Sequence, residues 1–256
     1  MVGLLRKVAL LLAALLFVTA VASANSYKEI VGDAKKFDGR VGVYAKNLKT
    51  GKALSFNQDT VFPAASTAKL VVAMALYKYL YPAASPAKKD LYDDNVDDMI
   101  VVSGNDSYRA MLAEIDALRP DALRKVTRDL RLKKTQVHSE DAYKRYNYHS
   151  VTTPYEMALV FENIYRDRYL GRQKSSELKY KLANTIFRDE IPRFMETPVM
   201  HKVGALDNLL CDVGIVDDGR DQILISVYTL TDRPEAYASD YIARTAAKAY
   251  NALRRK

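Results

Sequence analysis

Residues 61–80 read VFPAASTAKLVVAMALYKYL, and this stretch predicts both a local fold and a chemistry. A short extended segment leads into a helical run that we expect to extend from Ser66 to about Leu80, with Pro82 beyond it as a stop signal. Ser66 and Lys69 are three residues apart, so they share one face of that helix and the amine lies beside the hydroxyl. A serine needs an adjacent base to become a nucleophile, and a lysine can be that base when burial lowers its pKa.

The Ser-x-x-Lys pattern alone is a weak signal, because the chain contains it three times, beginning at Ser66, Ser85 and Ser176. The copy at Ser66 follows a strand-like segment and opens a long apolar helix. The N-terminus of such a helix directs N–H groups and a partial positive charge toward developing negative charge. Ser85 lies among prolines, and Ser176 lies in a charged polar stretch. The context therefore predicts Ser66 as the nucleophile and Lys69 as its general base.

Two further patterns offer groups that would complete such a site. Residues 103–105 read Ser-Gly-Asn at the end of a predicted helix, and residues 201–204 read His-Lys-Val-Gly on a predicted strand. A second hydroxyl can pass a proton to a leaving group, and an asparagine amide can hold the lysine or a substrate carbonyl. A strand lysine offers a fixed positive charge at the edge of a cleft, and a glycine lets a ligand backbone approach. Each pattern taken alone is more typical of a capped turn or of a strand end with a surface lysine.

The order of the three patterns resembles that of class A β-lactamases and penicillin-binding serine hydrolases. Two local features agree with this resemblance: Phe-Pro-Ala-Ala before Ser66, and Thr152-Thr153-Pro154 at the start of a helix after the middle loop. The resemblance covers roughly residues 28–254. It implies a two-lobed serine enzyme that forms an acyl-enzyme with a β-lactam or a D-alanyl peptide.

The resemblance also implies roles for further residues. They are a proton shuttle to the leaving nitrogen, an amide that positions the lysine and the substrate, a strand that receives the substrate, and an oxyanion hole. The resemblance assigns the proton shuttle to Ser103 and the positioning amide to Asn105. It assigns the strand that receives the substrate to Lys202 and Gly204, with Lys202 attracting the substrate carboxylate. It assigns the oxyanion hole to the backbone N–H groups of Ser66 and Ala205.

The sequence departs from the family pattern in three places. Val203 stands where the family usually has a hydroxyl that can donate to a carboxylate, which predicts weaker binding or a changed specificity. The interval from Ser66 to Ser103 is short, which predicts a trimmed helical lobe. The glutamate that activates the deacylating water in class A β-lactamases has no counterpart at the expected distance before Pro154. Glu140 would replace that glutamate if the loop is remodelled, or it is a solvated loop acid.

Hydrophobic periodicity predicts an α/β (α+β) fold, and the resemblance implies that it is of the β-lactamase/transpeptidase type. A five-stranded antiparallel sheet is flanked by terminal helices, and a small all-helical lobe adjoins it. The predicted strands are residues 40–47, 53–57, 198–203, 211–216 and 222–228. The predicted helices are residues 27–37, 66–80, 95–102, 107–118, 120–130, 154–167 and 235–253, with a loop over residues 133–150.

The first 24 residues predict a secretory signal peptide, because two basic residues precede an apolar run and Ala22-Ser23-Ala24 suits cleavage. The alternative is a membrane anchor, although the run is short for a span. We expect one hydrolase domain over residues 25–256, secreted, periplasmic or on the outside of the cell envelope. Its α/β lobe comprises about residues 25–65 and 195–256, and its helical lobe about residues 66–194.

The composition narrows the range of partners. Lys and Arg number 39 against 31 Asp and Glu, and they are dispersed, which argues against nucleic acid. Three scattered histidines give no metal site, and the aspartates at 93, 94, 97 and 98 lack the glycine and terminal glutamate of a calcium loop, so we read them as a solvated face. Cys211, the single cysteine, is predicted to be a buried small hydrophobe. We expect a monomer without cofactor that does not stay in the membrane after signal cleavage.

Three functions fit these residues. The first is a β-lactamase-like hydrolase that acts on β-lactams or related amides. The second is a D-alanyl-D-alanine carboxypeptidase, a penicillin-binding protein that acts on peptidoglycan stem peptides. The third is a non-catalytic envelope protein that binds muropeptides, although such a protein needs no activated serine.

Overall fold

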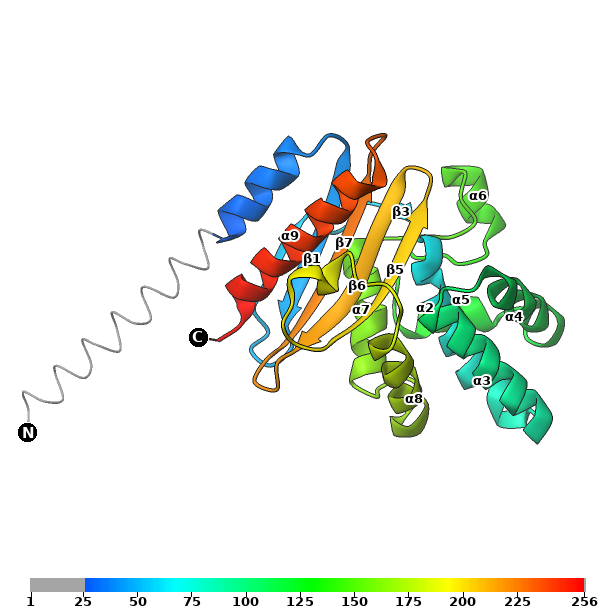
Figure 1. Ribbon diagram of the computed structural model, residues 1–256. Helices are drawn as coiled ribbons and strands as arrows, with labels where there is room; N and C mark the ends of the chain where they lie inside the picture. Colours follow the sequence, from blue (N-terminus) through cyan, green and yellow to red (C-terminus); the bar gives the residue numbers. More distant parts are fainter. Residues whose placement is uncertain (1–25, 256) are drawn as a thin grey trace, which may run out of the picture.

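The computed structural model describes residues 26–255, which are built around one five-stranded sheet (Figure 1). The strands are β1 (Arg40–Asn47), β2 (Ala53–Phe56), β5 (Val199–Leu206), β6 (Leu209–Asp217) and β7 (Gln222–Leu230). Their order in the sheet is β2-β1-β7-β6-β5, and every neighbouring pair is antiparallel. The predicted fold class is therefore confirmed, and β5 is an edge strand of the sheet.

Tight turns set the register of the two hairpins. The turn between β1 and β2 contains Gly51 with a φ of +75°, and the turn between β6 and β7 contains Gly219 with a φ of +78°. A residue with a side chain adopts this left-handed region only at a cost in free energy, whereas glycine adopts it without that cost. The N-terminal and C-terminal strand groups then join where β1 pairs with β7, from Arg40↔Leu230 to Asn47↔Ile223.

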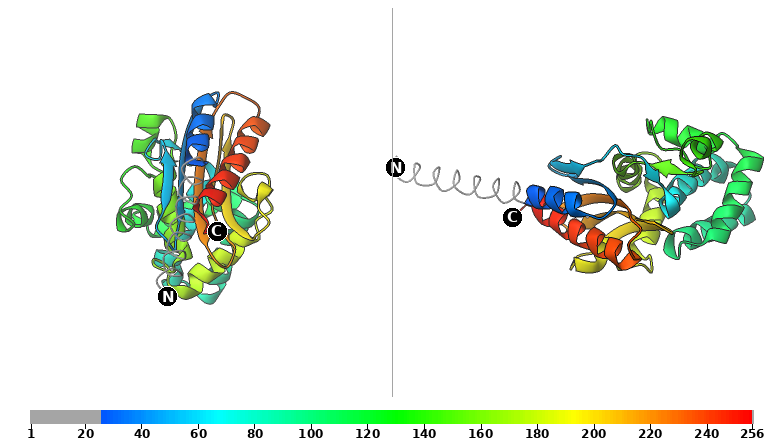
Figure 2. Two further views of the ribbon diagram at one scale, coloured as in Figure 1. Left: turned by 90° about the vertical axis from the view of Figure 1, so that its left-hand side faces the viewer. Right: turned by 90° about the horizontal axis from the view of Figure 1, so that it is seen from above.

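Both faces of the sheet are covered, as Figure 2 shows. The helix over residues 26–36 and α9 (Glu235–Leu253) lie side by side on one face. Along β1, Val41, Val43 and Ala45 point to this face, as the alternation of the sequence predicts. Tyr44 points to the opposite face, where the helical part packs. A sheet buried on both sides explains why its strands are almost continuously apolar.

The helical part lies between β2 and β5 in the chain. Its first helix begins with a 3-10 turn (Ala65–Thr67), continues as α2 (Ala68–Ala75) and ends in a π turn (Leu76–Leu80) and a 3-10 turn (Tyr81–Ala83). The other helices are α3 (Pro86–Val101), α4 (Asn105–Leu118), α5 (Ala122–Asp129), α6 (Glu140–Tyr146), α7 (Pro154–Tyr165) and α8 (Arg172–Ala183). Two short strands, β3 (Phe62–Pro63) and β4 (Val151–Thr152), pair beside them, and a 3-10 turn (Ile191–Phe194) precedes β5.

Several predicted boundaries were wrong. Helix α3 begins at Pro86, whereas the predicted helix began at residue 95. Proline suits a first helical position, and the Ser85 hydroxyl caps the helix by accepting from Lys88 N at 3.4 Å. Helix α6 lies inside the predicted loop. Helix α8 was missed because its buried residues are only Ser175, Leu178 and Leu182, which is a weak periodic signal in a polar stretch.

The predicted signal peptide, residues 1–24, lies outside the described residues. Within residues 26–255, no helix combines the length and the apolar character that crossing a membrane requires.

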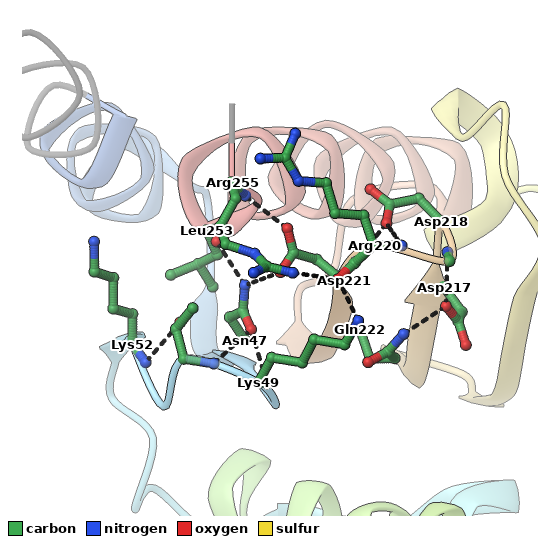
Figure 3. Close-up of polar contacts among 12 residues, drawn as sticks. Asn47, Lys49, Lys52, Asp217, Asp218, Arg220, Asp221, Gln222, Leu253 and Arg255 are labelled. Atoms are coloured by element: carbon green, nitrogen blue, oxygen red, sulfur yellow. Dashed lines mark hydrogen bonds and ion pairs between the residues drawn. The ribbon is translucent and has the colours of Figure 1, made fainter. Parts of the chain in front are cut away.

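A buried polar cluster closes the end of the sheet that is remote from α2 (Figure 3). The Asp221 carboxylate is fully buried and accepts from Asn47 Nδ2 at 3.0 Å, Arg255 Nε at 2.9 Å and Arg255 N at 2.7 Å. Asn47 Nδ2 also donates to the carbonyl oxygen of Leu253 at 3.0 Å. The cluster therefore ties the last turn of α9 to β1 and to the β6–β7 turn.

Replacing Asp221 should weaken the fold in a pH-dependent way. Burial opposes ionisation of Asp221, but hydrogen bonds from Arg255 and Asn47 outweigh it and hold the pKa below its usual range. A depressed folded-state pKa stabilises the fold above the unfolded pKa, about 4, and this contribution is lost as pH falls through the folded-state pKa. We expect Asp221→Ala to lower the free energy of unfolding by about 3 kcal/mol at pH 7 and by much less near pH 2.

Denaturant titrations at the two pH values measure this difference. The exposed pair of Asp106 and Arg109 supplies the control, since Asp106→Ala should change stability by less than about 0.5 kcal/mol. An Asp221→Ala effect that is the same at both pH values would contradict the role of the ionised carboxylate.

Candidate active site

Ser66 lies on a strained turn that leads into α2. Ala65, just before it, has a φ of +45°, a left-handed conformation that costs a non-glycine residue on the order of 1–3 kcal/mol. The turn is held from behind, where Thr67 Oγ1 donates to the Ala64 carbonyl at 2.5 Å. The buried Tyr228 hydroxyl lies 2.7 Å from Thr67 Oγ1 and therefore donates to it. The strain keeps the partly exposed Ser66 hydroxyl at the beginning of the helix.

The amine of Lys69 lies next to that hydroxyl. Lys69 Nζ is 3.1 Å from Ser66 Oγ, 2.5 Å from the Ser103 carbonyl oxygen, 3.2 Å from Ser103 Oγ and 2.8 Å from Asn105 Oδ1. The residue is only 2% exposed. Burial lowers the pKa of Lys69 to about 8; the charge of Asp98 opposes this shift and that of Arg109 adds to it.

The arrangement suits a neutral amine that accepts a proton. A neutral lysine has two N–H bonds and one lone pair. The two shortest contacts, to the Ser103 carbonyl and to Asn105 Oδ1, use the two N–H bonds. The lone pair is then left for the proton of Ser66, at a heavy-atom distance within the range that general-base catalysis requires.

Ser103 lies between the two lysines of the site. Its Oγ accepts from Lys202 Nζ at 2.9 Å and lies 3.2 Å from Lys69 Nζ. A charged lysine can donate hydrogen bonds but cannot accept them, so the hydroxyl proton of Ser103 is not used by the lysines and is free for a substrate. Ser103 has a φ of +59°, which aims both its carbonyl and its hydroxyl at the lysines.

Asp98 of α3 fixes this loop, and no sequence pattern had singled it out. A Cβ added to Gly104 would lie 1.5 Å from Asp98 Oδ2, so the carboxylate occupies the space that any side chain at position 104 would need. Gly104 N also donates to the Asp98 carbonyl at 3.0 Å. The reading of Asp98 as part of a solvated face was wrong, because it is half-buried under the Ser103 loop.

Asn105 begins α4 and binds Lys69. Its Oδ1 accepts from Lys69, so the Nδ2 group is turned toward other acceptors. The side chain is exposed, and an amide in this orientation can donate to a substrate carbonyl while it holds the lysine.

Lys202 lies deeper than a surface charge at a cleft edge. It is fully buried, and its Nζ donates to Ser103 Oγ and to the Val203 carbonyl at 3.0 Å. Burial, and next the like charge of Lys69, lower the pKa of Lys202 to about 7. Within residues 26–255, neither lysine of the site makes a hydrogen bond to a carboxylate.

Strand β5 forms the wall opposite Ser66. A Cβ added to Gly204 would lie 2.9 Å from Ser66 N and 3.1 Å from Ala65 Cβ. The glycine is therefore needed because the nucleophile turn packs against the strand, whereas we had expected it to admit a ligand. Ala205 follows as an exposed residue of the same edge strand. Val203 packs into the apolar cluster under α9 and is 7% exposed.

The structure does not bring Glu140 to the other site residues. Glu140 is the first residue of α6, its side chain is 75% exposed, and it pairs with His149 Nδ1 at 3.3 Å. Another acid of this region, Glu156, is buried, but its carboxylate accepts from the backbone N–H groups of residues 133–135 at 2.6–3.0 Å. Glu156 therefore anchors the loop, and Val137 within that loop is a buried apolar residue.

Two expectations concern metals and the cysteine. Cys211 is fully buried on β6, where its Sγ donates to the Gly204 carbonyl at 3.3 Å, so the prediction of a buried cysteine is confirmed. Between residues 26 and 255, no group of three or more potential ligand side chains is arranged to hold a metal ion.

Comparison with known families identifies the class of protein that this fold and site define. The model of Beta-lactamase2, described as a β-lactamase enzyme family, matches residues 23–82 and 85–253. The chain belongs to this family. A comparison with curated protein sequences gave no match.

Solved structures with the same fold include β-lactamases and a penicillin-binding protein. A β-lactamase from Sphaerobacter thermophilus superimposes with a TM-score of 0.75 at 19% identity, over 89% of this chain and 97% of that one. The TLA-1 extended-spectrum β-lactamase gives 0.78 at 16% identity, over 90% and 99%. A variant of PBP-A, solved as an acyl-enzyme complex with penicillin G, gives 0.75 at 19% identity, over 90% and 96%. At these identities the likeness establishes the β-lactamase/transpeptidase fold.

The pKa of Lys69 predicts how the reactivity of Ser66 depends on pH. Lys69 accepts a proton only when neutral, so the rate of labelling by a neutral fluorophosphonate should rise about tenfold per pH unit below pH 8 and level off above it. Lys69→Arg, which stays protonated, should react at least 100-fold more slowly. Lys78→Arg, on the exposed side of the same helix, is the matched control and should keep the wild-type profile. A wild-type rate that is flat between pH 6 and pH 9 would rule out Lys69 as the base.

Proposed function

We propose that the protein is a serine hydrolase in which Ser66 is acylated by β-lactams or by related peptide amides, and that release of the acyl group is slow. The contact between Lys69 Nζ and Ser66 Oγ at 3.1 Å, within a buried site that lowers the pKa of Lys69, carries this proposal. The shared hydrogen bonds of Ser103 support it, because they supply the second proton transfer that amide cleavage needs.

The acylation step moves two protons. Lys69 Nζ takes the hydroxyl proton of Ser66, and Ser66 Oγ forms a bond to the carbonyl carbon of the substrate. The oxyanion that develops faces the backbone N–H groups of Ser66 and Ala205 in this proposal. When the carbon–nitrogen bond breaks, the nitrogen takes the proton of Ser103, which is replaced through the adjacent amines of Lys69 and Lys202.

The residues around Lys69 are the reason that we propose slow hydrolysis of the acyl-enzyme. Hydrolysis of the acyl-enzyme needs a base within hydrogen-bond reach of the attacking water. No carboxylate among residues 26–255 hydrogen-bonds to Ser66 or Lys69, and Glu140 is exposed elsewhere. Lys69 alone is left to activate the water. This makes a penicillin-binding protein that acts on peptidoglycan stem peptides the closer analogy, with an efficient β-lactamase as the competing hypothesis.

The proposal includes export of the protein. The signal peptide expected over residues 1–24 and substrates of the cell envelope belong to the same side of the membrane. Lys202 contributes a positive charge that attracts the carboxylate of such substrates, acting from beneath Ser103. Val203 gives the strand no hydroxyl to assist it, so binding of the carboxylate should be weak.

A fluorescent penicillin and a chromogenic cephalosporin test the proposal. We expect one label per mature protein, a label lifetime of minutes or longer, and slow turnover of the cephalosporin. Ser66→Ala should carry no label. Fast turnover without a trapped adduct would support the β-lactamase, and a folded protein without adduct or turnover would support a non-catalytic muropeptide-binding protein.

The role of Glu140 has a separate test. Because this side chain is exposed and paired with His149, Glu140→Gln should change the lifetime of the acyl-enzyme by less than about twofold. Asp141→Asn, at the next position of α6, is the matched control. A longer lifetime in Glu140→Gln alone would assign the deacylating base to Glu140 and would require the loop to rearrange after acylation.

A further inference from the structure

A buried histidine–aspartate pair lies next to the site and takes no part in the chemistry proposed above. His201 and Asp212 are both fully buried, on neighbouring strands β5 and β6. His201 Nδ1 lies 3.0 and 2.9 Å from the two carboxylate oxygens of Asp212. Room for the ring comes from Gly214, where an added Cβ would lie 2.6 Å from His201 Cβ.

The second ring nitrogen binds a different part of the chain. His201 Nε2 lies 3.1 Å from the Phe187 carbonyl oxygen, which can only accept. Asp212 Oδ2 accepts from Ile191 N at 3.0 Å, so it is an acceptor as well. His201 Nε2 therefore carries the proton that the Phe187 carbonyl accepts, while Nδ1 is joined to the Asp212 carboxyl group.

These contacts fasten the connection between α8 and β5. This connection leaves the helical part at Ala183 and enters β5 at Val199, and it is held at the Phe187 carbonyl and at Ile191 N by the same pair. Its beginning is held by the helical part, because Ile186 N and Thr185 Oγ1 both donate to the Val101 carbonyl at 3.1 Å.

The fastened connection reaches the site through Phe187. The Phe187 ring centre lies 5.6 Å from Lys202 Nζ, within the range of a cation–π contact. In the part of the chain that the structure describes, the hydrogen-bond acceptors of Lys202 Nζ are Ser103 Oγ and the carbonyl of its neighbour Val203. The ring is therefore the third group that defines where the amine lies, and it helps to keep water away from it.

We propose that His201 and Asp212 are positioning residues for Lys202, which hold Phe187 over its amine and thereby keep the amine buried against Ser103. Loss of the pair frees the Phe187 carbonyl and Ile191 N, so the ring leaves Lys202 and water enters. The charge of Lys202 is then screened and its contact with Ser103 loosens. The consequence for anionic substrates rests on the proposed function, whereas the burial of Lys202 does not.

Because the pair acts through hydrogen bonds, variants that keep a link to the Phe187 carbonyl should behave differently from variants that lose it. In Asp212→Asn the amide can donate to Nδ1 of a neutral His201, whose Nε2–H still reaches the Phe187 carbonyl. Asp212→Ala and His201→Ala lose that link. Phe187→Ala leaves the pair intact and removes the ring alone. The matched control is Asp221→Ala, which removes another fully buried aspartate of the same sheet at its remote end (Figure 3).

Acetylation of Lys202 by an amine-reactive ester, followed by mass spectrometry, tests the proposal without any enzyme assay. Exposed Lys52 serves as the internal reference in each sample. We expect the acetylation rate of Lys202 to rise at least tenfold in Asp212→Ala, His201→Ala and Phe187→Ala. Asp212→Asn and Asp221→Ala should stay within about threefold of the wild type.

Two Ser66 reagents then measure the consequence for catalysis. Labelling by a penicillin, which carries a carboxylate, should fall at least tenfold more than labelling by a neutral fluorophosphonate in the same three variants. If wild-type protein takes no penicillin, the proposed function fails, and the acetylation of Lys202 still decides the role of the pair.

Two results would overturn the positioning role. The first is an acetylation rate of Lys202 that does not change in Phe187→Ala and does not change in Asp212→Ala or His201→Ala, taking whichever of these two variants folds. The other is an equal rise in Asp221→Ala, which would show that Lys202 responds to general destabilisation.

Discussion

Two lysine amines share one serine hydroxyl, and much of the local structure follows from this constraint. Neither amine forms an ion pair with any residue between 26 and 255. Lys69 and Lys202 both reach Ser103 Oγ, at 3.2 and 2.9 Å. Burial and mutual repulsion lower the pKa of Lys202 to about 7, and burial lowers that of Lys69 to about 8. A carboxylate in direct contact would hold both amines protonated and remove the base. The site therefore surrounds the amines with carbonyl, amide and hydroxyl oxygens, which leave both pKa values lowered.

Holding two amines in this way needs rigid support from several elements. Ser103 has a left-handed conformation, and its loop packs against Asp98. Ala65, before Ser66, is also left-handed, and its turn is held by the hydroxyl groups of Thr67 and Tyr228. Gly204 allows the edge strand to pack against that turn. Strained backbone of this kind persists only where the surrounding structure over-determines it. Here the sheet, α2 and α3 supply that support, and the residues that carry the proposed chemistry come from their ends.

Two buried polar clusters that do not carry the proposed chemistry have a different role, which is to join parts of the chain. The cluster around Asp221 joins the C-terminal helix to the strands, and the pair of His201 and Asp212 joins the helical part to the edge strand. Both aspartates are fully buried, yet each has its oxygens satisfied by N–H donors. Buried charges that are fully hydrogen-bonded specify one arrangement of the chain, because any other leaves a charge without partners.

The sequence by itself determined the sheet, the helix at Ser66 and the order of the three patterns. Apolar periodicity and turn residues are local properties of a chain, and they predicted the strands of the sheet, whereas the pairing of β1 with β7 was not predicted. Only the tertiary structure decided that Ser66, Lys69, Ser103, Asn105 and Lys202 meet, because hydrogen bonds across 34 to 99 residues have no local signature. It also decided that Asp98 lies under Gly104, that Glu140 lies away from the site, and that His201 reaches Phe187. Those positions depend on which surfaces pack together, and packing is a property of the whole chain.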